Sequence, residues 1–308
     1  TINKHSTMKV PVFECMLADD SKKHEKKMTG EVYVEPKLDG VRVITICDVD
    51  KDEVKMFSRN GKELNNFPKI LEQFDSMLDQ MAESMVFDGE VMSDDFQTLM
   101  REIHRKGGAK TDDAVLNLFD CIPLWAFKEG GYSASLQTRK EMMDEYEFGP
   151  NISKVEYVRM NLSDDDGQKQ FADYNKLCID KGFEGIMVKP MNGPYECKRS
   201  SLWLKVKPFI EVSLKVVDTE EGTGRNAGKL GALIVEGTDM DKFIKTNVGS
   251  GLTDSDRETF WKAKDKLIGQ IVEVRADAIT QNQDTTNEWS LRFPRFLRFR
   301  GFEPGEKI

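Results

Sequence analysis

Hydrophobic and polar residues alternate in several parts of the chain, and this period of two predicts β-strands. Residues 31–49 have the pattern strand–turn–strand: Val32 and Val34 alternate with polar neighbours, and Asp39-Gly40 marks the turn. Similar patterns predict strands at residues 115–125, 185–188 and 202–206.

A helical spacing of apolar residues separates these strands. Six apolar residues predict a helix over residues 67–85, with Pro68 near its start: Ile70, Leu71, Phe74, Met77, Leu78 and Met81. A second helix is predicted from Ser135, and a third from an N-cap at Ser163 to Lys181-Gly182. Strands and helices mix without regular β–α alternation, which predicts an α+β fold.

The last third of the chain has a different pattern. Short strands are predicted at residues 213–218, 232–236, 242–247, 271–278 and 289–299, with one helix at 254–267. Five strands and an inserted helix fit a small Greek-key barrel of the OB type. The segment 208–211 is the best boundary, so we expect domains at 1–209 and 210–308.

Composition narrows the class of protein. Hydrophobic residues make up 39% and charged residues 32% of the chain, as in ordinary globular proteins. No apolar run is long enough to span a membrane, and the polar start lacks the apolar centre of a secretion signal, so we expect a cytoplasmic protein. The five cysteines form no C-x-x-C pair, and we expect free thiols without a structural zinc site.

The net charge of −9 argues against a general nucleic-acid coat. Basic residues nevertheless crowd into one short C-terminal stretch, where they predict a local phosphate-binding surface: Arg292, Arg295, Arg298 and Arg300.

The sharpest local signal is the octapeptide of residues 35–42, Glu-Pro-Lys-Leu-Asp-Gly-Val-Arg. Taken alone, it is equally typical of a hairpin turn with a solvated lysine. Other segments, in a fixed order, favour a chemical role. They are Ser58-Arg59-Asn60-Gly61, Phe87-Asp88-Gly89-Glu90, Leu118-Phe119-Asp120, residues 183–189 (FEGIMVK) and residues 203–207 (WLKVK).

This series resembles the ordered motifs of the covalent nucleotidyltransferases, which comprise DNA ligases, RNA ligases and mRNA capping enzymes. The run of residues 291–300 (LRFPRFLRFR) resembles the last motif of ATP-dependent DNA ligases. The resemblance covers residues from about 8 to the end. It implies a nucleotidyltransferase (ATP-grasp-like) domain followed by an OB-fold, with Lys37 as the catalytic residue that carries AMP.

The resemblance also implies the rest of the site. Glu184 and Glu90 would hold Mg²⁺, or Mn²⁺ in its place. The nucleotide would contact Glu35, Arg42, Arg59, Glu90, Phe119, Lys205 and Lys207. The substrates would be ATP and nicked duplex DNA, and DNA would contact Arg59 and the four C-terminal arginines. Nothing in the sequence demands a protein partner or more than a monomer.

The residue types suit this chemistry. A free lysine has a pKa near 10.4, so neutralising a lysine nucleophile at pH 7 costs roughly 4.6 kcal/mol, which nearby cations and a hydrated metal lower. Lys205 and Lys207 alternate on a predicted strand, so both ammonium groups would point to one face and hold the α-phosphate. The alternative reading is an edge strand with exposed lysines.

A glycine-rich segment at residues 222–229 imitates a P-loop, but Leu230 stands where that motif needs Ser or Thr. We interpret it as a loop of the barrel that reaches DNA through Arg225 and Lys229.

The resemblance departs from the cellular pattern at Arg300-Gly301-Phe302-Glu303, which lacks the expected Asp and Lys and leaves the orientation of pyrophosphate to Arg298 or Arg300. The short stretch before residue 30 favours the minimal ligases of viruses and phages, which would work in the host cytoplasm. An RNA ligase, a GTP-using capping enzyme and a non-catalytic OB protein remain the alternatives.

Overall fold

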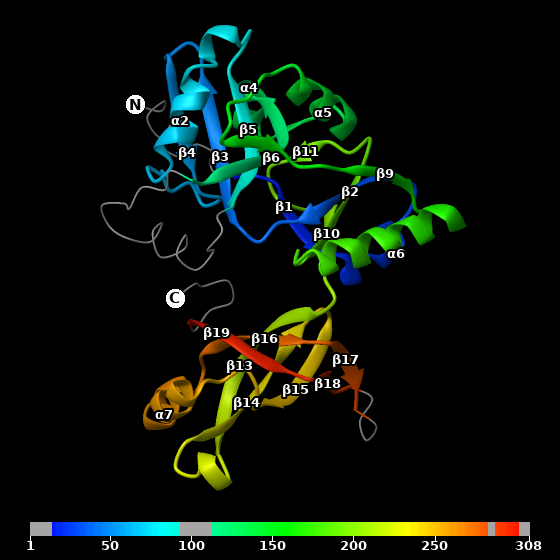
Figure 1. The fold of residues 1–308 in the computed structure, drawn as a ribbon. Coiled ribbons are helices and arrows are strands. Elements are labelled where there is room, and N and C mark those ends of the chain that lie inside the picture. Colours follow the sequence, from blue (N-terminus) through cyan, green and yellow to red (C-terminus); the bar gives the residue numbers. More distant parts are fainter. Residues whose placement is uncertain (1–13, 93–112, 283–286, 302–308) are drawn as a thin grey trace. The chain divides into compact units, whose positions relative to one another are not determined.

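Two compact units, Thr1–Val206 and Lys207–Ile308, make up the computed structural model of the chain (Figure 1). The structure describes residues 14–92, 113–282 and 287–301. Within these ranges, no helix is long and apolar enough to cross a membrane. The division between the units lies close to the boundary expected at residues 209 and 210.

The first sheet of the first unit has the strand order β1-β12-β10-β2-β9. Its strands are β1 (Leu17–Asp20), β12 (Arg199–Val206), β10 (Gly185–Pro190), β2 (Glu31–Lys37) and β9 (Val158–Asn161). The predicted strands at 185–188 and 202–206 are confirmed. β1 was not expected, because its four residues have no alternating pattern and it is held by parallel pairing with β12, far away in sequence.

The second sheet has the order β4-β3-β5-β6-β8. Its strands are β4 (Glu53–Phe57), β3 (Val41–Asp48), β5 (Met85–Met92), β6 (Val115–Pro123) and β8 (Ile152–Lys154). A two-stranded ribbon joins β7 (Gly131–Tyr132) to β11 (Tyr195–Glu196). The predicted strand at 115–125 ends early, because Pro123 caps helix α4 (Leu124–Glu129).

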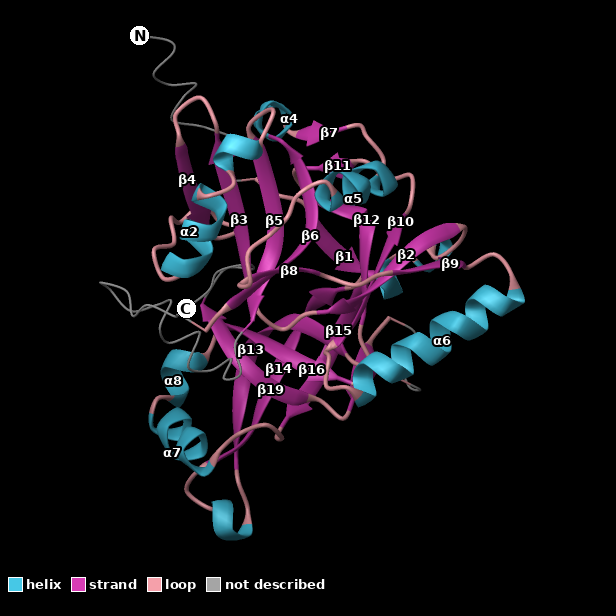
Figure 2. Cartoon of the chain, turned by 45° about the horizontal axis from the view of Figure 1, so that its top comes forward, coloured by secondary structure: helices cyan, strands magenta, loops and turns pink. Residues whose placement is uncertain are grey.

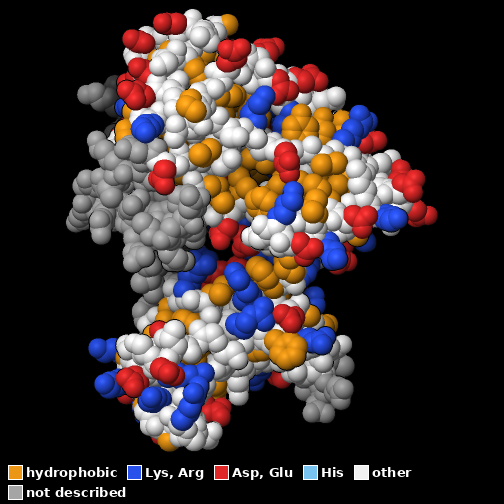
Figure 3. Space-filling view, viewed as in Figure 1, with side chains coloured by type: hydrophobic (Ala, Val, Ile, Leu, Met, Phe, Trp, Pro, Cys, Tyr) orange, Lys and Arg blue, Asp and Glu red, His pale blue; other side chains and the backbone are white. Residues whose placement is uncertain are grey.

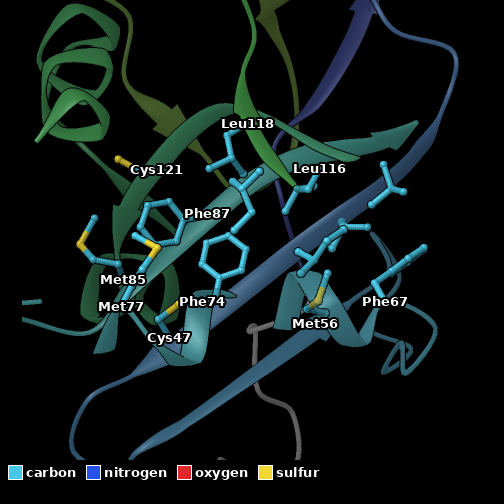
Figure 4. Close-up of a cluster of buried hydrophobic side chains, with 14 of the residues drawn as sticks. Cys47, Met56, Phe67, Phe74, Met77, Met85, Phe87, Leu116, Leu118 and Cys121 are labelled. Atoms are coloured by element: carbon cyan, nitrogen blue, oxygen red, sulfur yellow. The ribbon is translucent and has the colours of Figure 1, made fainter. Parts of the chain in front are cut away.

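Apolar clusters lie on both faces of the two sheets. One face of the second sheet packs against α2 (Pro68–Asp75), with Phe74 and Phe87 in contact at 5.4 Å between ring centroids (Figure 4). A second cluster joins β6 to β12 through Phe119 and Trp203. A third lies where the first sheet packs against α6 (Asp165–Asp180). Large aromatic side chains therefore fix both sheets from which the site is built.

Two helix predictions need correction. The single helix expected over residues 67–85 is α2 followed by a separate 3₁₀ turn, Leu78–Gln80. The Ser76 hydroxyl donates back to the carbonyl of Glu72 at 3.0 Å, a bond that competes with helix continuation. The N-cap of α6 is Asp164, whose carboxylate accepts from the amide of Gly167 at 2.7 Å. Ser163, the expected cap, instead accepts from the amide of Gly30.

Helix α5 (Leu136–Asp144) begins as predicted, with Ser135 as its N-cap. The Ser135 hydroxyl accepts a hydrogen bond from the amide of Thr138 at 3.1 Å.

The second unit is mostly strand (Figure 2). Its sheet has the order β17-β18-β15-β14-β13-β16-β19. The strands are β13 (Ile210–Glu221), β14 (Leu230–Asp239), β15 (Lys242–Val248), β16 (Ile271–Ala276), β17 (Ala278–Gln281), β18 (Trp289–Arg292) and β19 (Arg295–Gly301). The helix expected at 254–267 is α7 (Asp254–Lys262) and α8 (Lys264–Leu267), and a capping box of Thr253 and Asp256 starts it. The strand expected at 289–299 is divided by a turn in which Phe293 has φ 51°.

Candidate active site

Three neighbouring strands of the first sheet align the central residues of the site. Glu35 on β2 lies opposite Met187 on β10, which lies opposite Lys205 on β12. Residues directly opposite each other share a face of the sheet, and so do residues two positions apart on one strand. Lys37 and Lys189 therefore lie on that same face.

This face forms one wall of a cavity in the first unit. The other walls come from β1, β3, β5, β6 and the segment that follows β4. The residues that line the cavity are Leu17, Ala18, Lys37, Arg42, Arg59, Glu90, Phe119, Met187, Lys189, Arg199, Trp203 and Lys205. Six of the predicted site residues are among them: Lys37, Arg42, Arg59, Glu90, Phe119 and Lys205.

Lys37 is the last residue of β2, and its ammonium group lies 2.9 Å from the carboxylate of Glu184. Both side chains keep a little under a fifth of their surface exposed, so the pair is open to a group that enters the cavity. Gly40 follows in the turn, and a Cβ there would lie 2.4 Å from the carbonyl oxygen of Val91. Only glycine lets this turn pass so close to β5.

Glu90 approaches Lys37 from β5. Its carboxylate accepts a hydrogen bond from the amide of Gly40 at 3.1 Å. Burial raises the pKa of Glu90, and the positive charges of Lys37 and Arg42 oppose that rise. The amine of Lys37 therefore lies in the field of two carboxylates, those of Glu90 and Glu184.

These two carboxylates suit a magnesium ion, which also takes ligands from substrate and water, better than they suit a metal whose ligands all come from the protein. In the described parts of the chain, no group of three or more His, Cys, Asp or Glu residues is placed to hold a metal. Mg²⁺ characteristically binds one or two carboxylates together with substrate phosphates and water. Glu90 and Glu184 supply that donor set.

Aromatic rings form another part of the cavity wall. Phe119 on β6 and Trp203 on β12 make an edge-to-face contact, with 5.6 Å between ring centroids. The ammonium nitrogen of Lys189 lies 4.4 Å and 4.1 Å from the two centroids, and the guanidinium of Arg42 lies 5.2 Å and 5.6 Å from them. Such contacts stabilise a cation at an aromatic surface.

Arg42 is fixed by two acceptors. Its Nε and Nη2 donate to the two carboxylate oxygens of Asp88 at 2.5 and 2.6 Å, and Nη2 also donates to the carbonyl of Met16 at 2.7 Å. Burial works against the charged form, but the neighbouring Asp88 outweighs it and raises the pKa of Arg42 well above its usual value.

Glu35, one of the predicted nucleotide contacts, is placed differently from those that line the cavity. Its side chain is 2% exposed and does not line the cavity; its carboxylate binds Lys189 at 2.7 Å and also Lys140. Burial opposes its charge, but the two lysines outweigh this effect and lower the pKa of Glu35. Glu35 thus holds a lysine that lines the cavity.

Lys207 lies just beyond Val206, the last residue of β12. It belongs to the second unit, where it pairs with Glu211 at 3.4 Å and lies over the ring of Phe209.

Three of the residues that sequence reasoning missed show what it could and could not detect. Lys189 ends the FEGIMVK segment and alternates with Met187, a signal that was present. Asp88 stands within the Phe87–Glu90 motif, yet its role appears only through its contact with Arg42. Lys140 reaches Glu35 across 105 positions of sequence, and no local pattern indicates that contact.

The arginines predicted to bind DNA in the second unit have partners there. Arg298 and Arg300 bind the same buried carboxylate, that of Glu273, at 2.8 and 2.6 Å. Arg295 pairs with Asp277 at 3.1 Å, and the guanidinium of Arg292 lies over the ring of Phe293. Phe302 and Glu303, where the sequence departs from the cellular pattern, lie outside the described residues.

The loop at residues 222–229 contains a 3₁₀ turn, Gly224–Asn226, with Arg225 exposed, while Lys229 pairs with Glu258 at 3.3 Å. Lys and Arg side chains gather on the visible face of the second unit, whereas Asp and Glu side chains are spread over that of the first (Figure 3).

Comparison with known proteins decides the family. The family model described as ATP dependent DNA ligase domain matches residues 15–207, and the one described as DNA ligase OB-like domain matches residues 221–300. The chain belongs to the ATP-dependent DNA ligase family. The fold is accordingly a nucleotidyltransferase domain of mixed α+β structure followed by an OB-like domain.

Individual ligases resemble the chain over most of its length. A DNA ligase of Haloarcula marismortui is 32% identical over 87% of this chain and 51% of that ligase. A solved structure described as Pmar-Lig_Pre is 46% identical, with a TM-score of 0.65, over 98% of this chain and 72% of that one. The chain spans about half the length of the curated relatives first matched.

The ATP-dependent DNA ligase of bacteriophage T7 has a TM-score of 0.52 and 18% identity, over 94% of this chain and 99% of that one. At that identity the likeness shows the fold alone. The expected viral or phage origin therefore stays a prediction.

Proposed function

We propose that this chain is an ATP-dependent DNA ligase that joins a 3′-hydroxyl to a 5′-phosphate at a nick in duplex DNA. The observation that carries the proposal is the position of Lys37, at the wall of a cavity and 2.9 Å from Glu184. An amine nucleophile, carboxylates and several cations in one cavity suit the transfer of a nucleotide through phosphorus.

In the first step, the neutral amine of Lys37 attacks the α-phosphorus of ATP. A nitrogen–phosphorus bond forms, the bond from that phosphorus to the bridging oxygen breaks, and pyrophosphate leaves. Lys205 and Arg42 line the same cavity and supply positive charge for the phosphate oxygens. Phe119 and Trp203 offer an aromatic surface for the base.

Glu90 and Glu184 are the residues that would hold Mg²⁺ or Mn²⁺ together with phosphate oxygens. The ion would neutralise charge that develops on the phosphates. Glu184 has a second task, because its contact with Lys37 keeps the amine at the cavity.

In the second step, AMP passes from Lys37 to the 5′-phosphate of the nick, forming a new phosphorus–oxygen bond as the nitrogen–phosphorus bond breaks. In the third, the 3′-hydroxyl attacks that 5′-phosphate and AMP leaves. We infer that Arg59, Arg225, Lys229, Arg292, Arg295, Arg298 and Arg300 contact DNA phosphates, and that a monomer performs the reaction. Lys207 would supply a further cation from the second unit.

The test is transfer of label from ATP carrying ³²P at the α-phosphate, in the presence of Mg²⁺. A label on the protein that is stable to base and labile to acid is expected, as for a phosphoramidate. The label should be absent in Lys37→Ala and present in the matched control Lys154→Ala, which removes an exposed lysine paired with Asp144 at 2.7 Å.

A nicked duplex should then be sealed by the wild-type chain. Labelling from GTP in place of ATP would favour a capping enzyme, and sealing of nicked RNA alone would favour an RNA ligase. Absence of any adduct would overturn the proposal and favour a non-catalytic nucleic-acid-binding protein.

A further inference from the structure

A closed ring of hydrogen bonds surrounds Arg42 behind the cavity wall. Arg42 donates to Asp88 and to the carbonyl of Met16. The Tyr195 hydroxyl donates to the Oδ2 atom of Asp88 at 2.7 Å and accepts from the amide of Met16 at 3.1 Å. The carbonyl of Met16 thus accepts from Arg42, and its amide donates to Tyr195. The phenol oxygen of Tyr195 contacts both Met16 and Asp88, and so it closes the ring of hydrogen bonds.

Tyr195 is well suited to fix this ring. It is 2% exposed and does not line the cavity, and its ring makes an edge contact with Trp203 at 5.6 Å between centroids. Burial, and then the charge of Asp88, raise the pKa of Tyr195 well above its usual value, so the hydroxyl keeps its proton and the bond to Asp88 keeps its direction.

The backbone around Tyr195 is held in place by strand pairing. Tyr195 lies on β11 opposite Tyr132 on β7. A Cβ at Gly131 would lie 2.7 Å from the carbonyl oxygen of Tyr195, so glycine permits the two strands to approach. The phenol therefore extends from a braced ribbon toward the cavity wall.

The ring leaves part of Arg42 for a ligand. Nε and Nη2 are occupied by Asp88 and Met16, while Nη1 has no hydrogen-bond partner within residues 14–92, 113–282 and 287–301. Arg42 lines the cavity, so Nη1 is the donor that a group entering the cavity can use. The direction in which Nη1 points depends on the orientation of Asp88, which holds the same guanidinium group. Asp88 in turn keeps its orientation through the Tyr195 hydroxyl, a contact that spans 107 positions of sequence.

We propose that Tyr195 is a positioning residue for nucleotide binding, acting through Asp88 on Arg42. The proposal rests on the function proposed above. Without the hydroxyl, Asp88 loses one of its two side-chain partners and the amide of Met16 loses its acceptor. Arg42 would then sample more orientations. Binding of ATP would have to order the Arg42 side chain, and this entropic cost would lower the affinity.

The test uses Tyr195→Phe, which keeps the ring against Trp203 and removes one oxygen. Its matched control is Tyr132→Phe, the facing residue on the same ribbon, whose ring packs on Trp125. Equilibrium binding of ATP is measured by calorimetry with Lys37→Ala also present, so that no adduct forms. We expect the Kd to rise about tenfold for Tyr195→Phe, as for the loss of a hydrogen bond to a charged group, and less than twofold for Tyr132→Phe.

The kinetic counterpart is adduct formation with Lys37 intact. The KM for ATP should rise about tenfold in Tyr195→Phe while kcat changes less than twofold. A general loss of structure would lower kcat or the active fraction and would appear as a lower Tm. Should Tyr195→Phe not fold, Asp88→Asn, which weakens the same ring at its next member, is expected to show the same rise in KM.

A double-mutant cycle with Arg42→Lys separates positioning from packing. Because Tyr195 acts through Arg42, Tyr195→Phe should weaken ATP binding no further once Arg42→Lys is present. Additive losses, or an unchanged Kd in Tyr195→Phe, would overturn this inference while leaving the Lys37 adduct intact. A wild-type chain that forms no adduct would instead contradict the proposed function itself.

Discussion

Two lysine–glutamate pairs join β2 to the β10 region, and they differ mainly in burial. In one, Lys37 at the end of β2 pairs with Glu184 just before β10, and both side chains are 18–19% exposed. In the other, Glu35 on β2 pairs with Lys189 on β10, and both are 2% exposed. The strands exchange roles: β2 supplies the lysine of one pair and the acid of the other.

The difference separates a pair available for reaction from a pair that maintains structure. A buried ion pair has lost its hydration, so further partners must satisfy it, and Lys140 with the carbonyl of Phe119 provides them around Glu35. The open pair keeps access to the cavity. Burial, more than residue type, therefore assigns the two roles.

The largest effect on stability is expected when the carboxylate of Glu35, in the buried pair, is removed. Glu35→Gln leaves Lys140 and Lys189 buried without a carboxylate, and we expect the first unit to lose about 3–5 kcal/mol of stability. Urea denaturation followed by circular dichroism measures this. The matched variant Glu184→Gln, at the partly exposed pair, should change stability by less than about 1 kcal/mol. Equal losses in the two variants would refute the distinction.

The open pair should show its importance in the reaction. We expect Glu184→Gln to lower the rate of adduct formation about 100-fold, close to 2.7 kcal/mol, because the amine loses its carboxylate partner and the proposed metal site loses one of its two ligands. Single-turnover labelling with saturating ATP checks this. A rate within a few-fold of wild type would show that the contact with Lys37 is incidental.

A carboxylate about as exposed as Glu184 sharpens the comparison. Glu211 in the second unit is 20% exposed and accepts from Arg275 at 2.8 Å. Burial alone would raise its pKa, but Lys207 and Arg275 outweigh that and lower it from 4.5 to about 2.

Because the pKa of Glu211 is lower in the folded chain, its contribution to stability is present above pH 4.5 and is lost as the pH falls toward 2. Discounted for partial exposure, we expect Glu211→Gln to cost on the order of 2 kcal/mol at pH 7. The gap in Tm between wild type and variant should narrow steadily from pH 5 to pH 3. A gap independent of pH would mean that the charge of Glu211 is unimportant.

The smallest effect is expected for a fully surface pair. Lys154 and Asp144 are 42% and 56% exposed, so Lys154→Ala should alter stability by no more than about 0.5 kcal/mol and leave adduct formation unchanged. A chemical denaturation curve at two salt concentrations measures it.

The sequence predicted the parts of this site that are local. The alternation around Val32 and Val34 predicted β2 correctly, but the turn after β2 does not close a hairpin, because β2 pairs with β9 and β10 while β3 belongs to the second sheet. Short motifs located Lys37, Glu90 and Phe119, which the structure brings to one cavity. Ser and Asp are nearly equal in preference for the N-cap position, so the sequence alone does not separate Ser163 from Asp164, whose carboxylate caps α6.

Contacts between segments that are distant in sequence could not be predicted from the local pattern of hydrophobic and polar residues. The burial of Glu35 depends on Lys140, on a helix whose own spacing gives no sign of it. The end of β12 at Val206 was equally beyond the pattern, since Trp203, Lys205 and Lys207 continue the same period.

The five cysteines have a practical consequence. All are free and buried, and burial raises the pKa of every one of these thiols, to about 12 for Cys197. Since the thiolate is the reactive form, maleimide dyes should spare them in the folded chain. A cysteine introduced on the surface of each unit would then take the dye selectively. Fluorescence energy transfer between two such dyes would report the distance between the two units without removing any native thiol.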